Sequence, residues 1–257
     1  MTTGGARGRA RLAFRSAGLA GFTGTMLAGW LGRSRLGPRG DDPDVRDRWV
    51  RTWTKGLLRL YAIRLKVDGT IPPRGSGGRL IVSNHRSAID IGILLSVFGG
   101  RMVSRHDLAG WPMIGLAARS TGTVFVDRRS PQSGMLTIRA MRRVLEAGET
   151  ICVFPEGTTF AGDEVRPFQP GAFLAAARSG ADVIPVGIAY ATGSEAAFFD
   201  ETFPRHLARI SAAPPTRAVM SVGEPIATKG ARASALEATA HAAITARVAR
   251  ARALVDG

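Results

Sequence analysis

Apolar and polar positions along most of this chain follow two alternating patterns. Six short apolar runs are typical of buried β-strands, and polar, glycine or proline residues bound them. The runs cover residues 80–83, 102–104, 123–126, 150–154, 183–189 and 218–222. Between them, apolar residues recur at helical spacing, most clearly over 131–147 and 170–179. Strands that alternate with helices predict an α/β domain with a largely parallel or mixed central sheet.

The N-terminal part of the chain has a different pattern. A charge-free run at 16–32 lies between arginine-rich flanks. Its length reaches only the lower limit for a spanning helix of about 17–25 residues, and its glycines make it weakly hydrophobic. We expect a retained membrane-embedded or re-entrant anchor here. The alternative is a helix of small residues packed inside the protein.

A second helix is expected over about 45–63, after a polar linker at 37–44. One face of this helix carries Trp49 and Trp53, and the opposite face is basic. This arrangement suits the surface of an anionic membrane, and the alternative is a core-packing helix with a solvated basic face. The predicted organisation is an N-terminal membrane-anchoring segment at 1–66, a catalytic α/β domain at 67–228 and an alanine-rich C-terminal helix at 229–257.

Composition narrows the classes of partner. The 35 basic and 20 acidic residues give a net charge of +15, which implies a polyanion: a nucleic acid, an anionic membrane surface or a phosphorylated substrate. Zinc-finger spacing, basic-zipper heptads and an RNA-recognition signature are absent from the sequence, so nucleic acid is not the expected partner. The single cysteine, Cys152, excludes an internal disulfide framework and a cysteine-rich zinc site.

A histidine and an aspartate stand five residues apart, directly after the strand predicted at 80–83. They are His85 and Asp90. An imidazole can take a proton from a hydroxyl near neutral pH, and a carboxylate on its other nitrogen fixes the tautomer. The same segment is a good helix start, with Ser87 as N-cap and Asp90 at the third position. Asp90 is therefore a candidate orienting group, a capping residue, or both.

Three further segments contain candidate chemistry. The strand at 123–126 ends in an arginine pair that includes Arg128, and arginine can hold a phosphate bidentately. The segment 154–159 contains glycine and threonines that suit an anion, beside Glu156. Glu156 is expected either to accept a substrate hydroxyl or to anchor the loop through backbone amides or an arginine. Pro185 lies within an apolar strand, which predicts an edge strand or a bulge that shapes a pocket wall.

Taken together, these four segments resemble the glycerolipid acyltransferases, typified by 1-acylglycerol-3-phosphate acyltransferase. The blocks occur in the family's order over roughly residues 45–225. They are Asn84-His85-(x4)-Asp90, Gly122-(x2)-Phe125-Val126-Asp127-Arg128, Phe154-Pro155-Glu156-Gly157-Thr158 and Val183-Ile184-Pro185-Val186. The resemblance implies an α/β acyltransferase domain behind an N-terminal membrane-embedded helical motif.

The resemblance also implies a role for each matching residue. His85 would be the general base and Asp90 its orienting partner. Arg128 would hold the acceptor's phosphate, and Pro185 would shape the acyl-binding region. The residues expected to contact substrate are Asn84, Arg105, Arg128, Glu156, Gly157, Thr158, Thr159 and Pro185.

The implied reaction moves an acyl group from acyl-CoA or acyl carrier protein to the free hydroxyl of lysophosphatidate, giving phosphatidate. It is expected at the cytoplasmic face of the cell membrane and without a metal or other cofactor. One position departs from the family's pattern, because Thr159 stands where the block usually continues with arginine; Arg166 is the candidate replacement. This departure favours, as an alternative, another lyso-lipid acceptor such as lyso-ornithine lipid. A remoter alternative is a non-enzymatic basic protein that binds membranes or nucleic acid.

Overall fold

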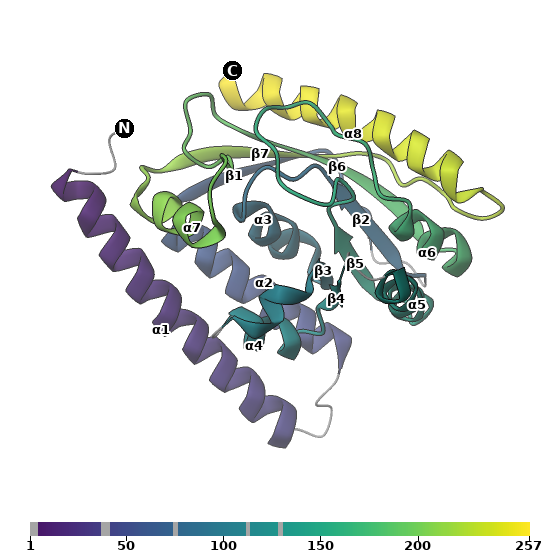
Figure 1. Ribbon diagram of the computed structural model, residues 1–257, viewed down its shortest axis with the longest axis horizontal. Helices are drawn as coiled ribbons and strands as arrows, with labels where there is room; N and C mark the ends of the chain where they lie inside the picture. The colour runs from purple at the N-terminus through teal and green to yellow at the C-terminus, as the bar shows by residue number, and fades with distance from the viewer. Residues whose placement is uncertain (1–4, 37–41, 74–76, 112–113, 128–130) are drawn as a thin grey trace.

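The computed structural model describes residues 5–36, 42–73, 77–111, 114–127 and 131–257. Within these residues, seven strands form a central sheet with helices on both faces (Figure 1). The strands are β1 (Ile63–Asp68), β2 (Arg79–Ser83), β3 (Arg101–Arg105), β4 (Val124–Val126), β5 (Thr150–Val153), β6 (Asp182–Tyr190) and β7 (Thr216–Val222). Their order is β1-β7-β6-β2-β5-β3-β4. The β6–β7 pair is antiparallel and the other pairs are parallel, so the sheet is mixed, as predicted.

The helices form two layers. They are α1 (Ala6–Leu36), α2 (Pro43–Leu60), α3 (Ile89–Phe98), α4 (Ile114–Ser120), α5 (Pro131–Glu146), α6 (Gly171–Ser179), α7 (Phe203–Ala212) and α8 (Ala233–Asp256), with a 3₁₀ helix η1 (His106–Gly110) before α4. Successive side chains of a strand point to opposite faces of the sheet. Leu80 and Val82 of β2 accordingly pack in a core with α5, α6 and α8, and Ile81 packs in a second core with α2 and α3.

The sequence analysis does not predict β1, although its residues alternate between apolar and polar as in a half-buried strand. This strand lies at the edge of the sheet and pairs in parallel only with β7, and most of its residues are half-buried or exposed. The predicted helix over 45–63 is shorter in the structure, because α2 ends at Leu60 and Ala62 takes a left-handed backbone conformation (φ 55°) before β1. The predicted domain boundary after residue 66 therefore falls inside a strand of the sheet.

Pro185 lies in a central strand, which corrects the prediction of an edge strand. β6 pairs with β2 on one side and β7 on the other. The antiparallel pairing with β7 ends at Val186, and the Pro185 carbonyl accepts a hydrogen bond from Gly223 just beyond it. The proline nitrogen, which has no hydrogen, faces this same side, where the regular ladder has stopped. Between the Val186–Val222 pair and the next bridge, Val183 to Ile226, the segment after β7 contains one residue more than β6. The extra residue that interrupts the ladder therefore lies in the segment after β7 and not in β6.

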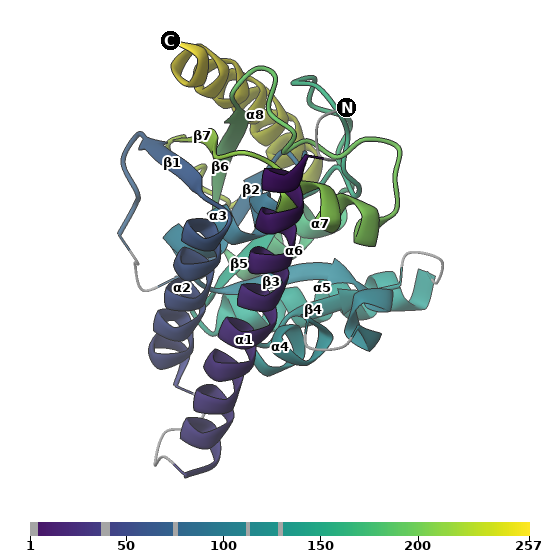
Figure 2. The ribbon, with the colours of Figure 1, turned by 90° about the vertical axis from the view of Figure 1, so that its left-hand side faces the viewer.

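The predicted charge-free run lies in the middle of α1, a helix of 31 residues that packs against α2 (Figure 2). Glycines make the close approach possible. An added Cβ at Gly18 would come within 2.7 Å of Leu60, and one at Gly29 within 2.7 Å of Trp49. The indole of Trp53 donates a hydrogen bond to Thr23 across the same interface. The face of α2 that carries Trp49 and Trp53 is thus covered by α1. This agrees with the alternative prediction, in which this helix packs inside the protein.

Two observations bear on the predicted anchor. Among the described residues, no helix combines the length and the hydropathy that crossing a membrane requires. Arg15 of α1 is buried and donates to the carbonyls of Leu60, Ile210 and Ala213, so it fixes the helix to α2 and α7. Most of the predicted linker, residues 37–41, lies outside the described residues. Membrane anchoring by the N-terminal segment stays a prediction.

Candidate active site

The candidate site lies at the carboxyl edge of the parallel part of the sheet. β2 ends at Ser83 and its parallel neighbour β5 ends at Val153, so the residues that follow them emerge at the same edge. The two segments are 84–90 and 154–159. They are joined directly, because the Phe160 amide donates to the carbonyl of His85 at 3.2 Å. Parallel pairing therefore brings together two of the blocks that the sequence analysis singled out.

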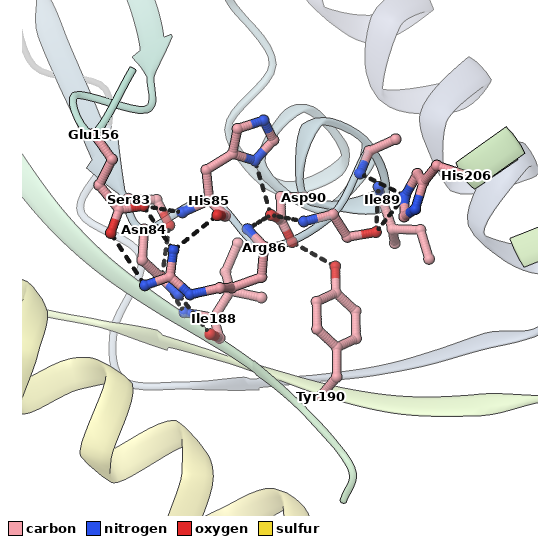
Figure 3. A network of polar contacts seen from close by, with 12 residues as sticks. Ser83, Asn84, His85, Arg86, Ile89, Asp90, Glu156, Ile188, Tyr190 and His206 are labelled. Carbon is pink, nitrogen blue, oxygen red and sulfur yellow. Dashed lines mark hydrogen bonds and ion pairs between the residues drawn. The ribbon is translucent and has the colours of Figure 1, made fainter. Parts of the chain in front are cut away.

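His85 and Asp90 form the predicted pair (Figure 3). His85 Nδ1 lies 2.9 Å from Asp90 Oδ2. The imidazole stacks on Phe154, with 3.9 Å between ring centroids and 5° between the planes. Because a carboxylate only accepts, Nδ1 carries the proton and Nε2 keeps its lone pair. Nε2 points away from the polar network and has no protein hydrogen-bond partner among the described residues. The ring is therefore oriented as a base that faces an incoming group.

Among the described residues, every hydrogen-bonding group that contacts the Asp90 carboxylate is a donor. Asp90 is fully buried. Besides His85, its Oδ2 accepts from the amides of Arg86 at 2.6 Å and Ser87 at 2.8 Å, and its Oδ1 accepts from the Tyr190 hydroxyl. Burial raises the pKa of Tyr190 well above 10, and the charge of Asp90 raises this pKa further. Tyr190 thus stays protonated and keeps donating to Asp90.

The helix start differs from the prediction by one residue. α3 begins at Ile89, so Ala88 occupies the N-cap position and Asp90 the second helical position. The Ser87 hydroxyl instead accepts a hydrogen bond from the Ile89 amide at 3.2 Å. Asp90 reaches back to two amides of the preceding turn while it holds His85. The orienting role and the local backbone role of Asp90 are therefore both present in the geometry.

Asn84 is buried beneath the site, in contrast to its predicted contact with substrate. Its Nδ2 donates to the carbonyl of Ile188 at 2.9 Å, and its Oδ1 accepts from the amide of Ile188 at 2.8 Å. The side-chain amide therefore extends the pairing of β2 with β6 past the end of β2. With both groups used in this way, Asn84 holds the backbone that carries His85.

Glu156 anchors its loop rather than facing substrate, which selects one of the two predicted roles. Its side chain is fully buried. One oxygen accepts from the His85 amide at 2.8 Å and from Arg86 at 2.7 Å, and the other accepts from Arg86 at 3.1 Å and from the Arg166 amide at 2.9 Å. Arg86 also donates to the carbonyls of Gly162 and Glu164. This pair therefore joins the segment with His85 to the loop after β5.

Replacing Glu156 by alanine is expected to destabilise the protein by about 3–5 kcal/mol, because it leaves the buried Arg86 guanidinium without its carboxylate. Chemical denaturation measures this change. Glu164 of the same loop provides the control: its side chain is 71% exposed, so Glu164→Ala is expected to cost less than about 1 kcal/mol. Equal stability of Glu156→Ala and the wild-type protein would contradict the anchoring role.

The predicted substrate residues of the third block lie close to the pair. Gly157 has φ +84°, a conformation that glycine adopts without strain, and its amide donates to Phe154. Thr158 is exposed and Thr159 is half-buried. The guanidinium of Arg166, the candidate replacement for the missing arginine, lies 5.3 Å from the ring centroid of Phe160 and 3.3 Å from Glu164. These residues thus border the segment next to His85.

Two other predicted residues of the described chain, Arg105 and Pro185, are not joined to the pair. Arg105 ends β3 at the same edge of the sheet, but it is exposed and forms an ion pair with Asp107 at 2.7 Å. Pro185 packs on the α8 face of β6, opposite to the face from which Tyr190 reaches Asp90. Its predicted role in the acyl-binding region receives no support from this position. Arg128 lies outside the described residues.

His206 belongs to the site although the sequence analysis does not single it out. It is fully buried in α7, and its Nε2 lies 3.3 Å from the Ala88 amide and 3.4 Å from Ser87 Oγ. Its Nδ1 lies 3.1 Å from Glu201. The Ala88 amide donates, so Nε2 accepts and Nδ1 carries the proton to Glu201. The five-residue spacing from Glu201 to His206 is the only local signal of this arrangement in the sequence.

The stability of the protein is expected to fall as the pH drops below about 6.5, with His206 as one cause. Burial lowers the pKa of His206 in the folded protein, and the nearby charge of Arg209 lowers it further. The unfolded chain therefore binds a proton at a higher pH than the folded chain does, so acid favours unfolding. Urea denaturation between about pH 5 and 8 should show a shallower pH dependence for His206→Gln than for the wild type. An identical slope in the two proteins would contradict this assignment.

The geometry supplies an oriented base, and two candidate nucleophiles of the described chain, Ser87 and Cys152, are engaged in structural contacts. Ser87 Oγ is buried and bonded to Ile89, and Cys152 is a buried thiol whose pKa is raised by burial. If His85 acts as a base, a hydroxyl of the substrate can serve as the nucleophile. Across the described ranges, no three His, Cys, Asp or Glu side chains gather as a metal-binding group.

Comparisons with known proteins agree with one another. The family model described as Acyltransferase matches residues 64–189. The chain is 31% identical to the lyso-ornithine lipid O-acyltransferase of Pseudomonas aeruginosa over 92% of this chain and 93% of that protein. It is 32% identical to the 1-acyl-sn-glycerol-3-phosphate acyltransferase of Neisseria meningitidis over 70% of this chain and 68% of that protein.

The fold is also similar to a solved structure. It matches the crystal structure of the 1-acyl-sn-glycerophosphate acyltransferase of Thermotoga maritima with a TM-score of 0.71 and 20% identity. The match covers 95% of this chain and 97% of that protein, so the likeness extends from the N-terminal helices to α8.

Proposed function

Because this chain belongs to the glycerolipid acyltransferase family, we propose that it transfers an acyl group from a thioester to the hydroxyl of a lyso-lipid. One observation supports this reaction above the others. His85 presents Nε2 outward while Asp90 holds Nδ1 at 2.9 Å, and the nearby Ser87 and Cys152 are turned to structural contacts. The acceptor's own hydroxyl is then the nucleophile.

The proposed reaction has two proton transfers at one nitrogen. The acceptor oxygen attacks the thioester carbonyl while its proton moves to Nε2 of His85. Asp90 stabilises the imidazolium that forms, since its charge lies beside Nδ1. The tetrahedral intermediate then collapses, the carbon–sulfur bond breaks, and the thiolate takes the proton from Nε2. His85 returns to its neutral form, and the products are an ester and a thiol.

The proposed acceptor is lysophosphatidate, and the proposed donor is acyl-CoA or acyl carrier protein. Arg105 supports a phosphate-bearing acceptor, because it is a predicted substrate residue that carries a positive charge at the carboxyl edge of the sheet. Its pair with Asp107 is 62% and 46% exposed, and such exposed pairs contribute only about 0–1 kcal/mol. A phosphate can therefore replace Asp107 as the partner of Arg105 at little cost.

A second acceptor, lyso-ornithine lipid, is supported by Thr159. A cation is missing at the position where the family's block usually carries one. The arginine that follows in the loop, Arg166, is engaged with Phe160 and Glu164. The relative that matches over 93% of its own length is named for this acceptor. The same chemistry at His85 serves either lipid.

The exposed basic side of α2 supports action at an anionic membrane surface. Arg48, Lys55 and Arg59 lie on this side, away from α1, and all three are exposed. Each basic residue near an anionic surface contributes about 1 kcal/mol of attraction. We include association with the cytoplasmic face of the cell membrane in the proposed function on this basis.

Product analysis tests the reaction and separates the acceptors. The purified chain is incubated with acyl-CoA or acyl carrier protein and with either lysophosphatidate or lyso-ornithine lipid, and mass spectrometry identifies the diacyl product. Phosphatidate as the main product supports the first acceptor, and diacyl ornithine lipid supports the second. Absence of product from all four combinations, with a folded protein, would contradict the proposed function.

Replacing Arg105 by glutamine is expected to raise KM for lysophosphatidate about tenfold with little change in kcat, because one charge-assisted hydrogen bond to the phosphate is lost. KM for lyso-ornithine lipid should stay close to the wild-type value. Asp107→Asn is the matched variant, since it releases Arg105 from its ion pair and should lower KM for lysophosphatidate. An unchanged KM in both variants would remove Arg105 from the acceptor site.

A further inference from the structure

A polar cavity lies at the amino edge of the sheet, away from His85. It has a volume of about 220 Å³. Its walls come from the C-terminal part of α1, the start of α2, the start of β3 and the end of α4. The lining residues are Trp30, Arg46, Arg101, Arg119, Ser120 and Gly122. Three arginines from three elements thus face one small space, near the lower ends of α1 and α2 in Figure 1.

Carboxylates balance the positive charge of this cavity only in part. Arg46 and Arg101 share a single carboxylate, Glu149, and Arg101 contacts both of its oxygens at 2.9 Å. Asp47 lies 3.5 Å from Arg46. Arg119 is exposed and donates to the carbonyl of Ala109, which carries no charge. Three guanidinium groups and two carboxylates leave an excess of one positive charge at the wall.

Arg46 is the most buried of the three arginines. Its side chain is only 7% exposed, and its Nε is buried without a hydrogen-bond partner among the described residues. A buried donor that lacks a partner costs about 1–3 kcal/mol, and more when it belongs to a charged group. Gly122 lets the guanidinium of Arg101 lie against the backbone, because a Cβ there would collide with it.

The size of the cavity selects a small anion. One water occupies about 30 Å³ of liquid, so the space holds an anion of phosphate size together with a few waters. A neighbouring apolar crevice shares Trp30, Arg46 and Ser120, but its volume is only about 30 Å³. An acyl chain does not fit in that crevice. Recognition therefore depends on the anionic group, and arginine forks match the oxygens of a phosphate.

We propose that this cavity binds a phosphate group, through Arg46, Arg101 and Arg119, at a site separate from the one that contains His85. The phosphate comes from one of two sources, the headgroup of an anionic lipid such as phosphatidate or free inorganic phosphate. The site does not depend on the proposed acyl transfer, because it shares no residue with the His85–Asp90 network.

Protection of arginines from phenylglyoxal, followed by peptide mass spectrometry, tests the site on the full-length protein. Three ligands are compared: inorganic phosphate, phosphatidate in neutral detergent micelles, and phosphatidylcholine in the same micelles. Phosphate or phosphatidate should slow modification of Arg119 and Arg101, while exposed Arg178 at the end of α6 reacts at an unchanged rate. Protection by both ligands identifies a general phosphate site, and protection by phosphatidate alone identifies a lipid headgroup site.

Variants make the assignment quantitative. Arg119→Gln removes an exposed side chain and should weaken phosphate or phosphatidate binding in equilibrium dialysis about tenfold, as expected for one charge-assisted hydrogen bond. Arg178→Gln should leave the affinity unchanged. Absence of protection by phosphate and phosphatidate, equal protection by phosphatidylcholine, or equal affinity of Arg119→Gln and the wild type would each overturn the proposal. None of these outcomes depends on acyltransferase activity, so each is distinguishable from failure of the proposed reaction.

Discussion

Replacing His85 by alanine is expected to lower kcat by about 10²–10⁴-fold, the usual contribution of a general base. The proton of the acceptor hydroxyl would have no acceptor at the position of Nε2, which has no protein partner in the described structure. The fold should survive, because the His85 backbone stays held by Glu156 and Phe160 through its amide and carbonyl. Thiol release from acyl-CoA in the presence of lyso-lipid measures the loss.

His106 offers a matched control for this substitution. It is a second histidine at the same edge of the sheet, directly after β3, and it is exposed. His106→Ala should keep thiol release close to the wild-type rate. Thermal unfolding should confirm that both variants are folded. A folded His85→Ala protein with activity close to that of His106→Ala would rule out His85 as the base.

Replacing Asp90 by asparagine is expected to have an effect of similar size, about 10²–10⁴-fold on kcat, because the orienting carboxylate is lost. An amide group cannot accept from every donor that surrounds Asp90. Its NH₂ would face His85 Nδ1 and two backbone amides, or else the Tyr190 hydroxyl. If NH₂ faces His85, the imidazole is driven to the tautomer in which Nε2 carries the proton and no longer serves as a base.

The same substitution also affects stability, which separates two roles of Asp90. A lost hydrogen bond that leaves a buried donor without a partner costs about 1–3 kcal/mol. Asp182→Asn is the control, since Asp182 is exposed at the opposite edge of the sheet. A merely structural Asp90 would lower stability but leave kcat of the remaining folded protein unchanged. A folded Asp90→Asn protein with wild-type kcat would therefore contradict the orienting role.

Most strands and the contact between His85 and Asp90 could be predicted from the sequence because their signals are local. Buried central strands are short continuous apolar runs, and six of the seven strands in the described chain appear in this way. His85 and Asp90 are five residues apart at a strand-to-helix junction, so the turn itself brings them together. β1 was missed because its apolar and polar residues alternate instead of forming a continuous run, and because the preceding helix was predicted to extend to residue 63.

The role of Asn84, and the choice between the two predicted roles of Glu156, could not be settled from the sequence, because their partners are distant in sequence. Asn84 bonds to Ile188, 104 residues away, and Glu156 bonds to Arg86, 70 residues away. Only the sheet order, with β2 between β5 and β6, places these residues side by side. Tyr190 and His206 were missed for the same reason. The family's motifs thus contain two kinds of residue. His85 and Asp90 form the proposed base, whereas Asn84 and Glu156 hold the backbone around it.

The N-terminal helices show how one pattern fits two structures. A run of glycines and apolar residues is compatible with a membrane anchor and with close helix packing. In the structure, glycines of α1 face Leu60 and Trp49 of α2, so the pattern is used for packing. The proposed contact with a membrane surface would use a different side of α2 from this packing, because the exposed side of α2 is the basic one.

Thiol release with and without a lyso-lipid tests direct transfer at His85 most directly. If the acceptor hydroxyl attacks the thioester itself, wild-type protein should leave acyl-CoA intact until lyso-lipid is added. Thiol and diacyl lipid should then form in equal amounts, and intact-mass spectrometry should find no acyl group on the chain. A burst of thiol equal to the enzyme concentration without lyso-lipid, accompanied by an acylated chain, would contradict the mechanism.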